Sequence, residues 1–81
     1  MGEPARADVE AISPDAWRLL RVAADFSQRD VEREIDEVMQ AHISMLESGT
    51  RALSADRRQQ LLDLYVAELA PEQVDALVEH F

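Results

Sequence analysis

Ile43-Ser44-Met45-Leu46-Glu47-Ser48-Gly49-Thr50-Arg51 lies at the end of the stretch, residues 26–51, that decides the fold. Ile43 and Leu46 are three residues apart, so they share one face of a short helix. Gly49 is predicted to end this helix, because glycine adopts a positive φ without steric cost. A second helix is predicted to begin at Ser27-Gln28-Arg29-Asp30, where a serine followed three residues later by an acid favours a capping box.

Two short helices in tandem are the outline of a helix-turn-helix. We predict an all-α, compact five-helix orthogonal bundle with helices at about 14–24, 28–35, 39–47, 54–69 and 71–81, and a turn at residues 36–38. Residues 1–12 are predicted to form a loose tail and residues 13–81 a single domain. The predicted core residues repeat at helical spacing: Trp17, Leu20, Ala24, Val31, Ile35, Leu61, Leu62, Tyr65, Val66 and Leu69.

The size of the chain leaves room for one domain with a small core, since it has 81 residues. It contains no cysteine, so neither disulfides nor thiolate metal sites are expected. We expect no metal and no cofactor. No apolar run is long enough to span a membrane, and the expected location is cytoplasmic.

The charge is strongly negative: 17 acidic residues face eight arginines and no lysine, for a net charge of −9. DNA repels such a chain at low salt, because neutralising phosphates supplies most non-specific affinity. A halophilic source is one interpretation, since concentrated salt screens this repulsion and an acidic surface stays hydrated. The alternative is an ordinary acidic protein from a GC-rich genome, which also selects arginine over lysine.

In its order of motifs the chain resembles the Cro/Xre-like helix-turn-helix family of phage repressors and small prokaryotic regulators, which has a lambda-repressor-like fold. The resemblance covers residues 17–65. It is carried by Ser27-Gln28, by Ile43-Ser44-x-Leu46-Glu47-x-Gly49-x-Arg51, by Ser54 at the start of the next helix, and by Leu61-Leu62-x-Leu64-Tyr65.

The same resemblance places an ion pair between Arg21 and Glu47. An arginine on the inner edge of the first helix and a carboxylate at the end of the third can form a bidentate pair. Such a pair would be structural. The alternative is two unrelated solvated charges.

The function that the resemblance implies is sequence-specific DNA binding by a transcriptional regulator, with the third helix in the major groove. Four outward residues would contact bases: Gln40, Ala41, Ser44 and Met45. Four others would contact phosphates: Ser27, Gln28, Arg29 and Arg51. The alternative for this surface is a solvated helix face.

The turn before the third helix departs from the family pattern. Seven residues separate Ile35 from Ile43, one more than usual, and Asp36 and Glu37 stand where a glycine is common. Glu32 also replaces a small residue. These changes predict a third helix that is lengthened or reoriented, and acids that repel DNA unless salt screens them. The main alternative is therefore an acidic protein–protein interaction module, such as an antitoxin or adaptor, on the same fold without DNA binding.

The last predicted helix carries an apolar stripe of Val74, Leu77, Val78 and Phe81. This stripe either caps the monomer core or forms a homodimer, as helix-turn-helix proteins commonly do to reach successive major grooves about 34 Å apart. The expected partners are double-stranded DNA and a second copy of the chain, or another protein. Nothing in the sequence pairs a catalytic acid with a base or activates a nucleophile, so an enzyme is not expected. His42 is predicted to be a packed or half-exposed side chain.

Overall fold

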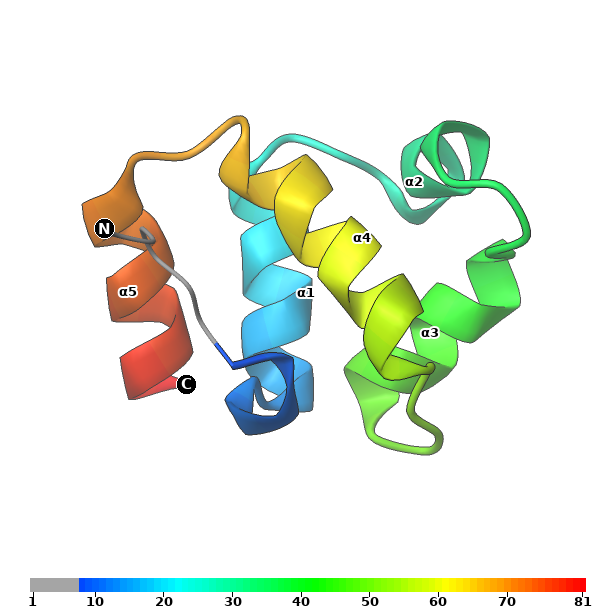
Figure 1. Ribbon diagram of the computed structural model, residues 1–81, viewed down its shortest axis with the longest axis horizontal. Helices are drawn as coiled ribbons and strands as arrows, with labels where there is room; N and C mark the ends of the chain where they lie inside the picture. The colour runs from blue at the N-terminus through cyan, green and yellow to red at the C-terminus, as the bar shows by residue number, and fades with distance from the viewer. Residues whose placement is uncertain (1–7) are drawn as a thin grey trace.

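The computed structural model describes residues 8–81 and contains, in that range, five α-helices and no strand, which confirms the all-α prediction (Figure 1). The elements are a 3₁₀ turn η1 (Val9–Ala11), α1 (Pro14–Ala23), α2 (Gln28–Glu34), α3 (Gln40–Ser48), α4 (Ala55–Val66) and α5 (Pro71–His80). α1 contacts α3, α4 and α5, so it forms the centre of the bundle. In the described part of the chain, no helix has the length and apolar character needed to cross a membrane.

Serine side chains begin three of the helices, as the sequence predicts. The hydroxyl of Ser13 accepts a hydrogen bond from the backbone N–H of Ala16 at 3.0 Å, and that of Ser54 accepts one from Arg57 at 3.2 Å. Ser27 does the same at the start of α2. These bonds satisfy backbone donors that a helix leaves free at its first turn. Proline stands at the first position of α1 and α5, where its missing N–H costs nothing.

The core lies where α1, α3 and α4 meet. Trp17 and Tyr65 are its largest fully buried side chains, and their rings meet edge to face with centroids 6.4 Å apart. Phe26 also packs against Tyr65, with 6.1 Å between the ring centroids. Burial raises the pKa of the Tyr65 hydroxyl above its ordinary value. All the predicted core residues of α1, α2 and α3 are buried; Val66 and Leu69 are half-buried.

The prediction of a loose tail is wrong for residues 8–12, because Val9 and Ile12 are both buried in the core. They lie three residues apart on one side of η1, which packs against α4. Glu10 extends this contact with an ion pair to Arg58 at 3.0 Å. A single turn is too short to show helical periodicity in a sequence, so only its tertiary contacts identify it. The remainder of the predicted tail, residues 1–7, lies outside the described range.

The turn between α2 and α3 occupies residues 35–39 and buries two side chains, Ile35 and Val38, in the core. Glu37 has a φ of +67°, the left-handed conformation for which glycine is the usual residue. The chain therefore makes a glycine-like turn without a glycine. The Glu37 carboxylate, brought toward α4 by this turn, forms an ion pair with Arg57.

α5 packs against α1, and the two helices run side by side in Figure 1. Val74 is completely buried between them. The prediction that Val74 belongs to a dimer interface is therefore wrong, since a side chain with no exposed surface has none to offer a partner. Leu77 and Val78 are half-buried, and Phe81 is 60 % exposed.

Candidate nucleic-acid interface

The outer face of α3 is uncharged. Gln40, Ala41 and Ser44 are exposed and Met45 is half-buried, while Ile43 and Leu46 anchor the opposite face in the core. The only acidic residue in α3, Glu47, is buried. In a chain of net charge −9, this helix therefore presents no acidic side chain to solvent.

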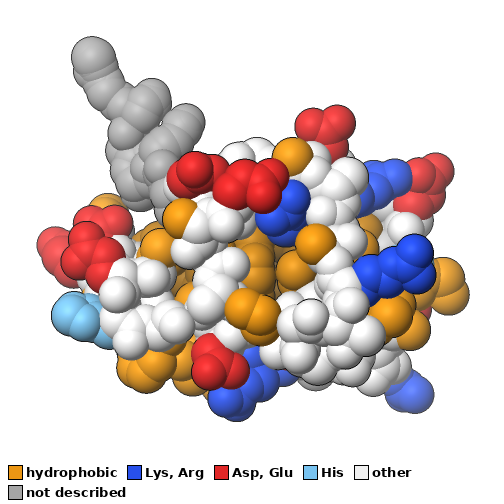
Figure 2. Space-filling model, turned by 90° about the horizontal axis from the view of Figure 1, so that it is seen from below, with side chains coloured by type: hydrophobic (Ala, Val, Ile, Leu, Met, Phe, Trp, Pro, Cys, Tyr) orange, Lys and Arg blue, Asp and Glu red, His pale blue; other side chains and the backbone are white. Residues whose placement is uncertain are grey.

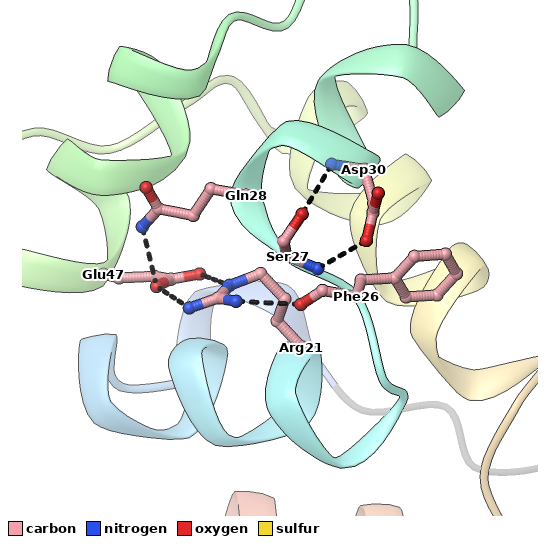
Figure 3. A network of polar contacts seen from close by, with 6 residues as sticks. All are labelled: Arg21, Phe26, Ser27, Gln28, Asp30 and Glu47. Atoms are coloured by element: carbon pink, nitrogen blue, oxygen red, sulfur yellow. Dashed lines mark hydrogen bonds and ion pairs between the residues drawn. The ribbon is translucent and has the colours of Figure 1, made fainter.

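A bidentate ion pair fixes the C-terminal half of α3 to α1 (Figure 3). Nε of Arg21 donates to one carboxylate oxygen of Glu47 at 2.7 Å, and Nη2 donates to the other at 3.0 Å. The two side chains are only 12 % and 5 % exposed. The hydrogen bonds that Arg21 donates to the Glu47 carboxylate raise the pKa of Arg21 above its ordinary value. The remaining Nη1 donates to the carbonyl of Phe26 at 2.8 Å, so the same guanidinium also holds the loop before α2.

The start of α2 joins this network. The side-chain amide of Gln28 donates to Glu47 at 3.2 Å, so Gln28 links α2 to α3. Ser27 and Asp30 form the predicted capping box, with each side chain accepting from the other's backbone N–H at 3.0 and 2.9 Å. The hydrogen bond that the backbone N–H of Ser27 donates to the Asp30 carboxylate holds the pKa of Asp30 below its ordinary value. Of the four predicted phosphate-contacting residues, Ser27 and Gln28 thus have structural partners within the protein.

The N-terminus of α3 is capped from α2. Oε2 of Glu32 accepts a hydrogen bond from the backbone N–H of Gln40 at 3.0 Å. Nδ1 of His42 accepts one from the backbone N–H of Met39 at 3.1 Å. Glu32, unusual for the resembled family at its position, therefore positions α3, and His42 has a local capping role. No sequence signal identified the Glu32 contact, because it joins residues eight apart across an irregular turn.

Arginines border the uncharged face. Arg29 and Arg51 are exposed, and neither has an ion pair with another residue in the range 8–81. Arg51 lines, together with His42, Met45, Ala52 and Leu53, a hollow of about 310 Å³ next to the outer face of α3. The turn between α2 and α3 holds two exposed acids, Asp36 and Glu37, of which Glu37 is paired with Arg57. Glu32, in α2, caps the N-terminus of α3.

The underside of the molecule, viewed in Figure 2, has an uneven distribution of charge. Acidic side chains gather at its left end, where α5 lies, and several basic side chains lie in its right half. Between η1, α1 and the loop after α3 there is an open cavity of about 180 Å³. Its wall is mainly apolar, and Arg51 and Arg58 lie among its lining residues. Within residues 8–81 no cluster of histidine and carboxylate ligands suits a metal ion.

The described chain is thus a small helical domain whose third helix is held by polar contacts from α1 and α2. Comparison with known families places it in one of them: the model of a domain of unknown function, DUF8599, matches residues 6–58, and the chain belongs to this family. The match includes η1, α1, α2, α3 and the first residues of α4, and it ends before α5. No curated protein and no solved structure matches the chain.

Proposed function

We propose that this protein is a sequence-specific DNA-binding regulator that reads base edges with the outer face of α3. The observation that carries this proposal is the absence of any exposed acid on α3 in an otherwise strongly acidic molecule. A helix placed in the major groove lies between two rows of phosphates, so an exposed carboxylate there would be repelled. The four exposed or half-exposed residues of the face can instead donate, accept or make apolar contact.

The roles of these side chains follow from their chemistry. Gln40 can bond an adenine through its amide, and Ala41 and Met45 can contact a thymine methyl. Ser44 can donate to or accept from a base edge. Arg29 and Arg51 are the phosphate contacts in this proposal, because both are exposed and neither pairs with another described residue.

Rigid support for α3 agrees with a reading role, because base recognition requires donors and acceptors held within narrow tolerances. Arg21 and Gln28 hold its C-terminal half through Glu47, and Glu32 holds its first turn. The pairing of Glu37 with Arg57 also lowers the repulsion expected from the turn. The network itself is structural and would have no contact with DNA.

A DNA-selection experiment with the purified full chain tests the proposal, run at about 0.1 M and about 2 M salt to span weak and strong screening. We expect enrichment of a defined site, lost in a Gln40→Ala, Ser44→Ala double variant. The control is an Asp75→Ala variant, which changes an exposed residue of α5 and should select the same site as the parent chain. Enrichment only at high salt would support the halophilic interpretation. No enrichment at either salt, from protein with a normal helical spectrum, would reject DNA reading in favour of a protein-binding module.

A further inference from the structure

The cavity of about 180 Å³ between η1, α1 and the loop after α3 is open to solvent and lined chiefly by apolar side chains. Ile12 and Trp17 form its floor, since both are buried, and Pro14 forms part of its exposed rim. Apolar cavities of about 150 Å³ in proteins are large enough to bind benzene. The cavity therefore has the size and chemistry to take up one phenyl ring.

The molecule also exposes one phenyl ring. Among the described residues the large apolar side chains most exposed to solvent are Val22, Met39 and Phe81, and Phe81 is the aromatic one, at 60 %. It follows directly on α5, whose Val74 is buried against α1. Burying an aromatic side chain removes a large apolar area from water, so a partner that covers this ring would gain binding energy from it.

The elements that line the cavity and the end of the chain that carries Phe81 lie along the same edge of the molecule (Figure 1). α1 and α5 run in opposite directions, so the start of α1 and the end of α5 both lie at the lower edge of Figure 1, together with the loop after α3. A projection and a cavity on one face allow two copies to make the same contact twice around a two-fold axis. Such a reciprocal interface closes at a dimer and does not extend into a filament.

The charges around the two features are complementary. Arg51 lines the cavity and has no ion pair with another residue in the range 8–81. Arg58 also lines it; its Nη atoms bind Glu10, but its buried Nε has no hydrogen-bond partner in that range. By contrast, residues 59–81 contain five acids and no arginine or lysine, and Glu79 is exposed two residues before Phe81.

We propose that the chain forms a two-fold symmetric dimer in which Phe81 of each copy enters the cavity of the other and Glu79 faces Arg51 across the interface. The partner is thus a second copy of this chain. The interface differs from the expected apolar stripe of α5, because Val74 is internal and the receiving surface belongs to η1, α1 and the loop after α3. Arg51 could contact either Glu79 of the second copy or a DNA phosphate, but not both at once. The proposed dimer does not depend on DNA binding.

Sedimentation equilibrium of the full chain without DNA tests this proposal. We expect a dimer that forms as the protein concentration rises. Phe81→Ala should lower its association constant at least tenfold, whereas Val22→Ala, at a similarly exposed apolar position on α1, should leave the association constant unchanged. Circular dichroism and melting checks that each variant is folded. A monomeric parent chain, or an unchanged association constant in Phe81→Ala, would overturn the proposal.

A mixing experiment distinguishes insertion into the cavity from stacking of one Phe81 on another. Ala52→Trp places a large side chain at the cavity, and this variant should be monomeric, as should Phe81→Ala. When the two variants are mixed, they should form a heterodimer that native mass spectrometry detects. The Phe81→Ala variant keeps an open cavity and the Ala52→Trp variant keeps the phenyl ring that enters it. The absence of a heterodimer would contradict cavity insertion.

Charge exchange gives a second readout that does not depend on filling the cavity. Arg51→Glu should weaken the dimer, and Arg51→Glu combined with Glu79→Arg should restore it at low salt. Equal association constants for the single and double variants would reject the Arg51–Glu79 contact.

Discussion

α3 and α5 are helices of similar length, nine and ten residues, but the protein holds them in different ways. α3 has one acid, Glu47, which is buried and bonded to Arg21 and Gln28. α5 has three acids that are all exposed, and a single fully buried side chain, Val74, secures it to α1. The same residue type therefore serves as a structural anchor in one helix and as a solvated surface in the other.

This difference in anchoring indicates which kind of interaction each helix is suited to. Hydrogen bonds and ion pairs with defined geometry fix the rotation and height of α3, as a surface that recognises a particular pattern of groups requires. Apolar packing of Val74, with Leu77 and Val78 half-buried beside it, constrains the direction of α5 less and leaves its acidic side and Phe81 exposed to a partner. We therefore expect substitutions to affect the two helices very unequally.

The largest expected effect is at the acid of α3. Glu47→Ala leaves the poorly exposed Arg21 guanidinium without its partner, so we expect a loss of about 3–5 kcal/mol in the free energy of unfolding. Asp75→Ala, at an exposed acid of α5, should change it by less than about 0.5 kcal/mol. Urea denaturation followed by circular dichroism measures both. Similar losses in the two variants would show that the Arg21–Glu47 pair is not a special anchor.

The next effect concerns the end of α3. Gly49 has a φ of +78°, and a Cβ built there would lie 3.3 Å from Cγ of Pro14. Gly49→Ala should therefore destabilise the fold by about 1–2 kcal/mol, the usual cost of the left-handed conformation for a residue other than glycine. Gly49→Asn should cost less if conformation dominates, since asparagine tolerates this region better. An asparagine variant less stable than the alanine variant would indicate that contact with Pro14 dominates instead.

The smallest expected effect is a difference in pH dependence between the N-terminal cap of α2 and that of α5. The α2 start uses the carboxylate of Asp30, whose pKa is lowered by its bonds with Ser27, whereas the α5 start uses the uncharged amide of Gln73, which accepts from Ala70 at 2.9 Å. A carboxyl with a lowered pKa contributes stability above its unfolded pKa of about 3.9 and loses it as the pH falls through the folded value.

We therefore expect acid to loosen α2 before α5. NMR chemical shifts of the first-turn amides, followed from pH 6 to pH 2, measure this, and the Ser27 amide should titrate while the Ala70 amide should not. An Asp30→Asn variant is the control and should remove the titration. Equal titration at both helix starts would contradict the assigned cause.

Local sequence signals predicted much of the fold because their effects operate within one turn of helix. Ser13, Ser27 and Ser54 cap the helices where a serine before an amphipathic segment indicates a start, and Gly49 ends α3. Arg21 and Glu47 were paired by resemblance over a distance in sequence, and the structure brings them into bidentate contact. The cap of Glu32 on Gln40 was not foreseen, because no sequence pattern reports contacts made across an irregular turn.

For the candidate interface, the outward direction of Gln40, Ala41 and Ser44 followed from the spacing of Ile43 and Leu46 alone. The engagement of Gln28 by Glu47 did not, since it depends on the distance between two helices. Similarly, Val9 and Ile12 became core residues only because η1 lies against α4.

The sequence by itself determined the number of α-helices, the residues at which they begin and which face of each is apolar, because backbone capping and helical periodicity are properties of neighbouring residues. It did not determine the end of α4, which stops at Val66 and not at Leu69. Only the tertiary structure decided which acids are anchors and which are surface, that Val74 is internal while Phe81 is exposed, and that an apolar cavity lies along the same edge of the molecule as the end of the chain that carries that ring. Those outcomes depend on how close separate helices approach, and the energy of a charge or a phenyl ring is determined by what surrounds it in space.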